Sequence, residues 1–265
     1  MAIHPTAIIY PRAEIHETAE IGPYAVISGP ARIGANCRIW NHAHIGGELQ
    51  MGEANEVHPF AIVGHVPQIT NYDGKLRRTL IGNRNVFREG VSVHWASKDE
   101  GATVIGDDCL FMANSHIAHD CRIGNRVILV NGALLAGHVE VQDSAFISGN
   151  SVVHQFVRIG RFVMFRGLSG VGKDVCPFMM VSGIDRLAWK INRVGLSRSG
   201  FTPQARNEIK RAHRVLFRDG NSVPRAVEIL KAGDPGPEIQ EIITFIEGSQ
   251  RGILRTLTGA DSEED

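Results

Sequence analysis

Two histidines and an aspartate lie within the seven residues "SHIAHDC", from Ser115 to Cys121. Histidine titrates near neutral pH and is the most common general base of enzymes, and a neighbouring aspartate can fix its tautomer. Both residue types also bind metal ions. The stretch is therefore consistent with an acid–base centre, a metal site or two ordinary surface histidines. The structure of the backbone that carries it decides between these interpretations.

The backbone around this stretch has a six-residue repeat. An apolar residue occurs at every sixth position from Ile3 to Val63, and the same phase returns from Ile81 to Val93 and from Ile105 to Val171. A small residue often follows four positions later, and glycine often comes directly after the apolar residue. This period fits neither an α-helix nor an alternating strand. It is typical of hexapeptide-repeat parallel β-helices, in which three hexads make a coil of about 18 residues.

We therefore predict a mainly β fold in two domains. A left-handed parallel β-helix of hexapeptide repeats is expected over residues 1–185, with about eight to nine coils, its aliphatic residues inside and its small residues at the bends. The left hand is taken from known hexapeptide proteins, because crossovers between parallel strands are otherwise right-handed. A small α-helical C-terminal domain is expected over residues 186–265.

The C-terminal domain shows helix start and stop signals. Thr202 and Ser222 are cap residues followed by proline, and Gly220 and Gly233 are stop signals. The predicted helices cover 203–219, 223–232 and 237–255, and they could cap the open end of the β-helix. The acidic tail "GADSEED" is expected to be disordered.

Two segments interrupt the repeat and then return to its phase. These are residues 66–79 and 95–103. We interpret both as loops that leave the coils, and loops on a rigid scaffold commonly carry binding residues. The alternative is that each is a tolerated surface insertion.

Composition restricts the function classes. The chain has 265 residues and a formal net charge of zero, which argues against nucleic-acid binding driven by bulk charge. Its four cysteines form no C-x-x-C pair, as expected in a reducing compartment. The N-terminus lacks a signal-peptide pattern, and no segment is apolar enough to span a membrane. We expect a soluble cytoplasmic protein with no nucleic-acid partner and no stable membrane insertion.

The coil period gathers the candidate site residues. His119, Gly137 and Gln155 are 18 residues apart and stack in one column, and His138 lies one position past that column. Gly137 removes a side chain beside His119 and exposes a backbone N–H. The residues gathered on this surface are His116, His119, Gly137, His138, His154 and Gln155.

The chemistry that this group offers is narrow. His119 is the candidate general base, and Asp120 can orient it. Cys121 occupies a small-residue position of the repeat, so we interpret it as a buried cysteine and not a nucleophile. The free N–H of Gly137 could stabilise an oxyanion. These features favour direct acyl transfer to a hydroxyl or an amine.

A metal site and a non-catalytic solenoid are the alternatives. Hexapeptide carbonic anhydrases also bind zinc through β-helix histidines, with paired ligands spaced H-x-x-x-x-H. His116 and His119 are spaced H-x-x-H, which departs from that pattern. Metal analysis would distinguish these alternatives.

Several motifs resemble one known family. "SHIAHDCRIGNRVIL", "LLAGHVEV", "VVHQFVRIG" and "GLSGVGKDVCPFMMVSG" are similar to the UDP-N-acetylglucosamine O-acyltransferase family of lipid A biosynthesis, within the hexapeptide-repeat acyltransferases. "GFTPQARNEIKRAHRVLFRDG" resembles the first helix of its C-terminal domain. The similarity covers almost the whole chain. The related UDP-3-O-acylglucosamine N-acyltransferases usually have an additional N-terminal domain, whereas the hexads here start at residue 3.

The resemblance implies a specific reaction. Family members are homotrimers with active sites between neighbouring β-helices, and they transfer a 3-hydroxyacyl chain from acyl carrier protein to the 3-hydroxyl of a UDP-sugar. No metal or organic cofactor is implied. His119 matches the base, Asp120 its partner and Gly137 the oxyanion donor. The residues that match substrate contacts are His116, His138, His154, Gln155, Asn192 and Arg198.

The chain departs from the family pattern in the first loop. Ile69 and Asn71 stand where the family usually has an aspartate and a lysine near the sugar. Asp73 and Lys75 keep the D-x-K spacing and are candidates to replace them. Ser199 stands where a second basic residue often occurs. A UDP-3-amino sugar, or another amine or nucleotide-sugar acceptor, therefore stays open beside UDP-N-acetylglucosamine.

Two further surfaces follow from the resemblance. Met164, Gly167, Phe165 and Arg166 match the region that sets acyl chain length, and Asp185 stands where a histidine can occur. Side-chain volume there would limit the accepted chain. A second set of basic residues could dock the acidic carrier protein or could be a solvated charged face. This set is Arg158, Arg161, Arg166 and Lys173.

Overall fold

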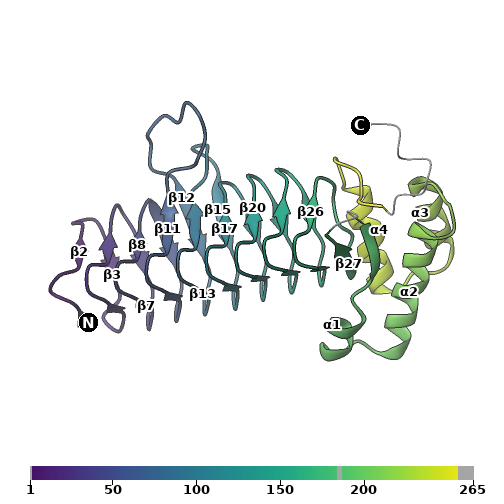
Figure 1. The fold of residues 1–265 in the computed structure, drawn as a ribbon, viewed down its shortest axis with the longest axis horizontal. Helices are drawn as coiled ribbons and strands as arrows, with labels where there is room; N and C mark the ends of the chain where they lie inside the picture. Colours follow the sequence, from purple (N-terminus) through teal and green to yellow (C-terminus); the bar gives the residue numbers. More distant parts are fainter. Residues whose placement is uncertain (1, 184–186, 256–265) are drawn as a thin grey trace.

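The computed structural model describes residues 2–183 and 187–255. The chain forms a long left-handed parallel β-helix with α-helices at its C-terminal end (Figure 1). Its three flat sides are three parallel sheets, which we call face A, face B and face C. Consecutive strands along the chain lie on different faces, so that three strands complete one coil. The predicted fold class is confirmed.

Face A has eleven strands. Its last pair, β27 and β28, is antiparallel, whereas the other pairs are parallel. In order the strands are β1 (Ala2–Ile3), β4 (Glu20–Ile21), β7 (Arg38–Ile39), β10 (Glu56–Val57), β13 (Val86–Phe87), β16 (Leu110–Phe111), β19 (Ile128–Leu129), β22 (Phe146–Ile147), β25 (Met164–Phe165), β27 (Met179–Ser182) and β28 (Leu187–Ile191).

Face B has nine strands and carries the histidine stretch on β17. In order they are β2 (Ile8–Ile9), β5 (Val26–Ile27), β8 (His44–Ile45), β11 (Ile62–His65), β14 (Ser92–His94), β17 (His116–Ile117), β20 (Leu134–Leu135), β23 (Val152–Val153) and β26 (Gly170–Val171). His116 pairs with Leu134, which confirms the offset of 18 residues between coils.

Face C has eight strands, and three of them are longer than the rest. From the N-terminal end they are β3 (Glu14–Ile15), β6 (Arg32–Ile33), β9 (Glu48–Met51), β12 (Arg78–Ile81), β15 (Ala102–Ile105), β18 (Arg122–Ile123), β21 (Glu140–Val141) and β24 (Arg158–Ile159). Arg78 pairs with Ala102 and Thr79 with Thr103, so the two loops end at residues 77 and 101. The predicted ends at 79 and 103 are wrong, because this pairing extends the strands backwards.

The core and the corners follow the hexad pattern. The apolar residue of each hexad points inside, and the small residue four later is buried at the bend, as with Ile117 and Cys121. The residue directly before this small residue has a left-handed backbone in most of the hexads described, for example Asp120 and His138, with φ of 60° and 61°. This conformation costs a non-glycine residue about 1 kcal/mol, and the stacked coils impose it.

Within residues 187–255, four helices follow the sheet: α1 (Arg193–Arg198), α2 (Pro203–Phe217), α3 (Val223–Ala232) and α4 (Pro237–Glu247). Thr202 and Ser222 accept hydrogen bonds as N-caps, as predicted. The predicted third helix is too long, because it ends at Gly248 and the chain then returns to pair Ile253 with Asp174. Strand β28 and helix α1 were not predicted.

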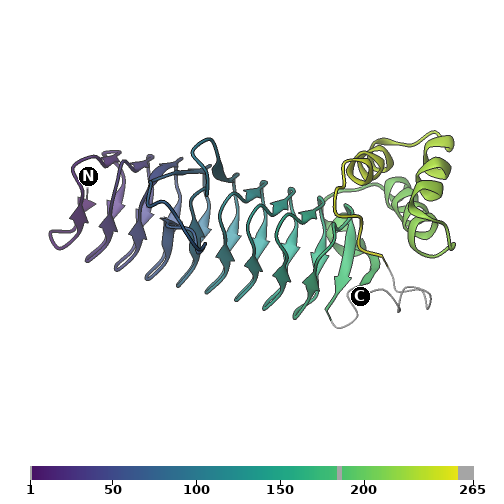
Figure 2. The same cartoon turned by 90° about the horizontal axis from the view of Figure 1, so that it is seen from above.

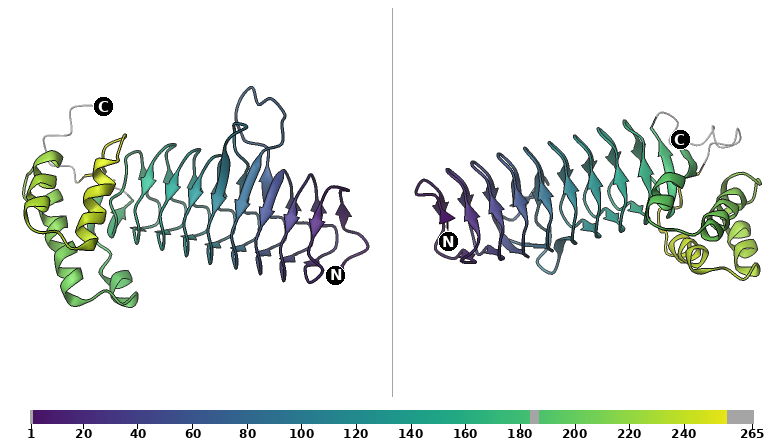
Figure 3. Two further views of the ribbon diagram at one scale, coloured as in Figure 1. Left: turned by 180° about the vertical axis from the view of Figure 1, so that it is seen from behind. Right: turned by 90° about the horizontal axis from the view of Figure 1, so that it is seen from below.

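The helices lie beside the last coils and not beside the first (Figures 2 and 3). None of the helices in the described part of the chain has both the length and the apolar character needed to cross a bilayer. The predicted domain boundary at 185/186, Asp185 and the predicted disordered tail lie outside the described residues.

Candidate active site

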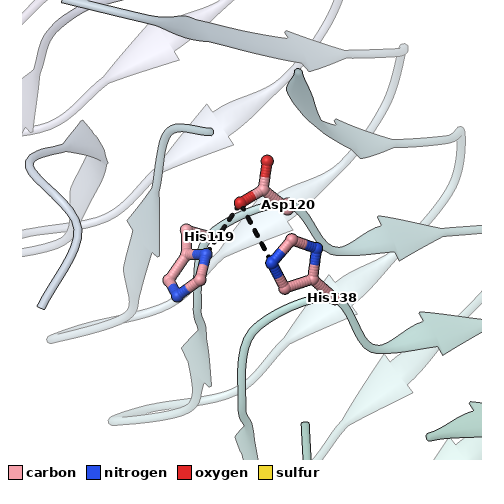
Figure 4. A group of neighbouring side chains, drawn as sticks. All are labelled: His119, Asp120 and His138. Carbon is pink, nitrogen blue, oxygen red and sulfur yellow. Dashed lines mark hydrogen bonds and ion pairs between the residues drawn. The ribbon is translucent and has the colours of Figure 1, made fainter. Parts of the chain in front are cut away.

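The histidine stretch lies where β17 ends and the chain turns from face B toward face C. His119 and Asp120 occupy this corner, and His138 occupies the same corner one coil later (Figure 4). Asp120 and His138 both have a left-handed backbone conformation at this corner. The coil arithmetic used above therefore predicts this arrangement correctly.

His119 and Asp120 form a tight pair. The Nδ1–H of His119 donates to Asp120 Oδ2 over 2.7 Å. The side chains are 16% and 11% exposed, so the pair lies in a partly dry site. A proton held on Nδ1 leaves the lone pair on Nε2, which has no hydrogen-bond partner among the described residues. This is the tautomer that a general base needs.

Asp120 is held from three sides. Its Oδ2 also accepts a hydrogen bond from the backbone N–H of Ser97, over 3.0 Å. Its own N–H donates to Thr103 Oγ1 over 2.9 Å. Burial alone would raise the pKa of Asp120, but the hydrogen bonds from His119 and Ser97 outweigh it and lower the pKa to about 2. The carboxylate is therefore ionised and can stabilise an imidazolium.

Gly137 lies against the ring of His119. A Cβ at this position would stand 2.6 Å from Cε1 and 2.7 Å from Nε2 of His119, which is closer than van der Waals contact allows. The Gly137 N–H has no backbone acceptor within the described ranges. Glycine thus keeps the face of the base open and leaves a donor beside it, as predicted.

His138 completes the cluster from the next coil. Its Nε2 lies 3.6 Å from Asp120 Oδ2, which is too long for a hydrogen bond but close enough for attraction when the ring is charged. The ring stacks on Phe156 at 4.6 Å and meets the His119 ring edge-on at 5.2 Å. Burial lowers the pKa of His138, so its ring is neutral at pH 7.

His116 lies on face B beside a histidine that the sequence reasoning missed. Its Nδ1 hydrogen-bonds with Ser92 Oγ at 2.8 Å, and its ring packs edge-on against His94 at 5.0 Å. His94 is 5% exposed, and its Nδ1 has no partner in the described structure. Burial lowers the pKa of His94 to about 4. Strand β14 pairs with β17 at an offset of 24 residues, because the second loop lies between them, so the 18-residue spacing does not point to His94.

His154 and Gln155 lie one coil beyond His138 and are exposed. The Nδ1 of His154 donates to the backbone oxygen of Gln155 over 3.1 Å. Phe156, the next residue, stacks on His138. The structure therefore puts this pair next to the cluster, and its contact with substrate stays a prediction.

Asn192 and Arg198 are placed differently at the two ends of α1. Asn192 is buried, because its Oδ1 caps Gly195 N–H and its Nδ2 donates to the Phe162 backbone oxygen. Arg198 is exposed and lines a groove of about 640 Å³ between α1 and α2, together with Arg206. The groove is rich in cations, as a phosphate site requires, while Asn192 serves the helix cap.

Asp73 and Lys75 are engaged within the loops. Both oxygens of Asp73 accept hydrogen bonds from the guanidinium of Arg77, at 2.8 and 2.7 Å. Lys75 Nζ donates to Asp99 Oδ2 at 2.9 Å. The structure does not join either side chain to His119, and their predicted sugar contact would require this network to open.

The predicted acyl-chain pocket needs one correction. Phe165 is fully buried in the core of the β-helix, because it occupies the inward position of its hexad. Its assignment to a surface pocket is therefore wrong. Met164 points outward from face A, and Arg166 and Gly167 are exposed at the following corner. These three residues stay candidates for the pocket.

The predicted basic docking surface is only partly formed. Arg161 donates to both oxygens of Glu241, and Arg158 donates to the Phe245 backbone oxygen, so both bind helix α4. Including these two in a free docking face is wrong. Lys173 is exposed. The sequence could not show that the helices would fold back onto these arginines.

A metal ion could use the same cluster. His119, Asp120 and His138 each offer one possible ligand atom, and these three atoms lie within 4.8 Å of one another. Asp120 Oδ2 accepts the Nδ1–H of His119, however, so a cation bound between these two atoms would have to displace that proton. Cys121 is fully buried and burial raises its pKa to about 12, which excludes it as a nucleophile or thiolate ligand at neutral pH.

Known protein families match both the coils and the helical region of this chain. A family model described as UDP N-acetylglucosamine O-acyltransferase, domain 2, matches residues 174–254, and the bacterial transferase hexapeptide model matches 12–47 and 102–137. The acyl-[acyl-carrier-protein]–UDP-N-acetylglucosamine O-acyltransferase of Thermodesulfovibrio yellowstonii is 46% identical, over 96% of this chain and 99% of its own. That of Agrobacterium fabrum is 40% identical, over 95% and 94%.

Solved structures agree with these relatives. The UDP-N-acetylglucosamine acyltransferase of Francisella novicida superposes with a TM-score of 0.92 at 35% identity, covering 99% of both chains. The UDP-N-acetylglucosamine O-acyltransferase of Moraxella catarrhalis gives a TM-score of 0.92 at 37% identity, covering 96% of this chain and all of the other. The similarity therefore includes both the coils and the helical region.

Proposed function

This chain belongs to the UDP-N-acetylglucosamine O-acyltransferase family, and we propose that its His119–Asp120 pair drives the family reaction. In that reaction a 3-hydroxyacyl chain moves from acyl carrier protein to the 3-hydroxyl of UDP-N-acetylglucosamine, as the first step of lipid A biosynthesis. The observation that carries the proposal is the 2.7 Å bond from His119 Nδ1 to Asp120, which leaves Nε2 as a base beside the open face of Gly137.

The reaction proceeds by direct transfer. His119 Nε2 removes the proton from the sugar hydroxyl, and the oxygen attacks the carbonyl carbon of the thioester. The carbonyl electrons move onto its oxygen, and the Gly137 N–H stabilises this oxyanion. The intermediate then collapses, the carbon–sulfur bond breaks, and the carrier thiolate takes the proton from His119. Asp120 stabilises the transient imidazolium throughout.

Substrate contacts follow from positions around this pair. We propose that His116, His138 and Gln155 contact the acceptor sugar and its phosphates, and that His154, Gln155 and Arg198 contact the nucleotide end. Met164, Gly167 and Arg166 lie where the acyl chain would extend. The proposed reaction calls for no metal or organic cofactor, because the thioester already activates the acyl group.

The active unit is a homotrimer. Face C carries charged side chains outside, such as Arg122 and Glu140, whereas face B exposes Leu134 and Val152, which are 42% and 47% exposed. Face A is also apolar in its later coils, where Phe146 points outward. Two different apolar faces suit a closed ring of copies that meet through unlike surfaces. His116 lies on face B, so a neighbouring copy would line the site.

The protein works in the cytoplasm. Cys37, Cys109, Cys121 and Cys176 are all free thiols in the structure, which matches a reducing compartment.

Acyl transfer by the purified protein tests the proposal. A panel of 3-hydroxyacyl carrier proteins is offered to UDP-N-acetylglucosamine and to its 3-amino analogue, with His119→Ala alongside, and products are followed by mass spectrometry. We expect transfer to the hydroxyl sugar that collapses in the variant. Transfer to the amino sugar alone would shift the assignment to an N-acyltransferase, and full activity in His119→Ala would overturn the base. Metal analysis of the same active sample tests for a bound ion.

A further inference from the structure

A single buried guanidinium joins the two loops that leave the coils, residues 66–77 and 95–101. The side chain of Arg77 is 6% exposed. It makes a two-pronged contact with Asp73 in its own loop, and its Nε donates to Asp99 Oδ1 in the other loop over 3.0 Å. Planar, two-pronged contacts between arginine and carboxylate fix geometry as well as charge. Arg77 thus holds one loop against the other.

The neighbours of Arg77 complete this network. Tyr72 OH accepts hydrogen bonds from Arg77 Nη1 over 2.7 Å and from Trp95 Nε1 over 2.6 Å, and it donates to the Lys75 backbone oxygen. Lys75 in turn pairs with Asp99. Each loop therefore contributes polar groups that are satisfied by the other, which makes the arrangement specific.

The second loop touches the catalytic carboxylate. The N–H of Ser97 donates to Asp120 Oδ2, the same oxygen that receives the His119 proton. The loop is also tied to face C, because Arg78 donates to the backbone oxygens of Glu100 and Gly101. Only Lys98 separates Ser97 from Asp99, so the anchoring of Asp99 limits where the Ser97 N–H can lie.

We propose that Arg77 is a positioning residue for Asp120, acting through Asp99 and Ser97, and this inference rests on the proposed function. The network of Arg77, Asp73, Asp99, Tyr72 and Lys75 fixes the loop at 95–101, and the loop fixes the carboxylate. Asp73 and Lys75 thereby serve the positioning network in place of the sugar contact that their spacing predicts. When the network breaks, Asp120 loses the Ser97 donor and swings away from the productive geometry.

The test compares Arg77→Met and Asp99→Asn with a matched control, Arg84→Met. Arg84 makes a similar two-pronged contact with Asp108 across neighbouring coils, but it has no link to Asp120. Asp73 and Asp99 are 44% and 61% exposed, so water can solvate them when Arg77 is replaced and the coils stay folded. The assay is acyl transfer with kcat and KM measured separately across pH.

We expect kcat to fall about 10-fold in both network variants, with KM for the UDP-sugar unchanged. The combined variant should fall no further, because both changes break one pathway. Arg84→Met should match the wild type.

Hydrogen exchange of the Ser97 amide supplies a readout that does not depend on activity. Faster exchange in Arg77→Met, with Arg84→Met unchanged, supports the proposal even if the assigned reaction itself fails with wild-type protein. Unchanged exchange overturns it. A raised KM with unchanged kcat also overturns it, because that pattern belongs to a lost substrate contact.

Discussion

Two ion pairs of equal length perform different tasks in this molecule. His119 Nδ1 lies 2.7 Å from Asp120 Oδ2 in the corner of the coils, and Arg161 Nη2 lies 2.7 Å from Glu241 Oε2 where helix α4 meets the last coils. The first pair leaves one ring nitrogen with a lone pair in an open site. The second uses both carboxylate oxygens, and Arg161 also packs against the rings of Phe162 and Phe178. A hydrogen-bond distance alone therefore does not distinguish catalysis from packing.

The two pairs differ in whether the basic side chain can give up its proton. An imidazole can accept and return a proton during a reaction, whereas the hydrogen bonds that Arg161 donates to Glu241 raise the pKa of Arg161, which stays charged. The open face beside Gly137 gives His119 access to substrate. Arg161 is enclosed by aromatic rings and can only hold the helices in place.

The largest effect is expected for removal of the catalytic base. His119→Ala should lower kcat by about 10³-fold, because general-base assistance is lost, while the free energy of unfolding stays near the wild-type value. Steady-state kinetics and chemical denaturation on the same samples separate the two quantities. A strongly destabilised but active variant would make this pair structural, like Arg161–Glu241.

The second-largest effect is expected when a methyl group is added beside the catalytic base. Gly137→Ala places a Cβ within 2.7 Å of His119 Nε2, which forces the ring aside. We expect kcat to fall on the order of 10²-fold with the fold retained. Gly172→Ala is the matched control, because its Cβ would meet no atom within 4 Å. Equal losses in both variants would show that glycine substitution harms the coils in general.

Acidic pH should lower the free energy of unfolding, because it protonates the buried His94. Burial lowers its pKa to about 4, below the 6.5 of an exposed histidine, so the unfolded chain binds the proton first as pH falls. Stability from neutral His94 is complete above pH 6.5 and is lost as pH falls toward 4, by about 2 kcal/mol at pH 5. Denaturation of His94→Gln should show a flatter pH dependence. The surface variant His16→Gln should keep the wild-type slope.

The smallest effect is expected at the helix junction. Arg161→Met should cost about 1.5 kcal/mol of stability by removing charged hydrogen bonds to Glu241, with kcat unchanged. Limited proteolysis should then cleave the helical region sooner than the coils. A loss of activity without faster cleavage would instead connect Arg161 to catalysis and remove the contrast between the two pairs.

The repeat explains why much of this could be predicted from sequence. Because the coils enforce an 18-residue offset, the meeting of His119, Gly137 and His138 follows from position alone. The same phase should have placed Phe165 in the core, and we assigned it by resemblance instead. Long-range contacts outside the repeat, such as Arg161 with Glu241, depend on how separate elements pack, and no spacing in the chain encodes them.

The loops leave the coils and rejoin them without altering the phase of the repeat. Strand β12 pairs with β9 and β15 in register on either side of these excursions, so the backbone register of the coils does not depend on the residues within the loops. The coils are therefore a rigid scaffold on which the two loops can be exchanged without changing the strand register. Exchanging residues 66–77 and 95–101 together for those of a relative should therefore leave the coil register and the place of His119 unchanged, while the hydrogen bond from the loop to Asp120 depends on the new loop sequence.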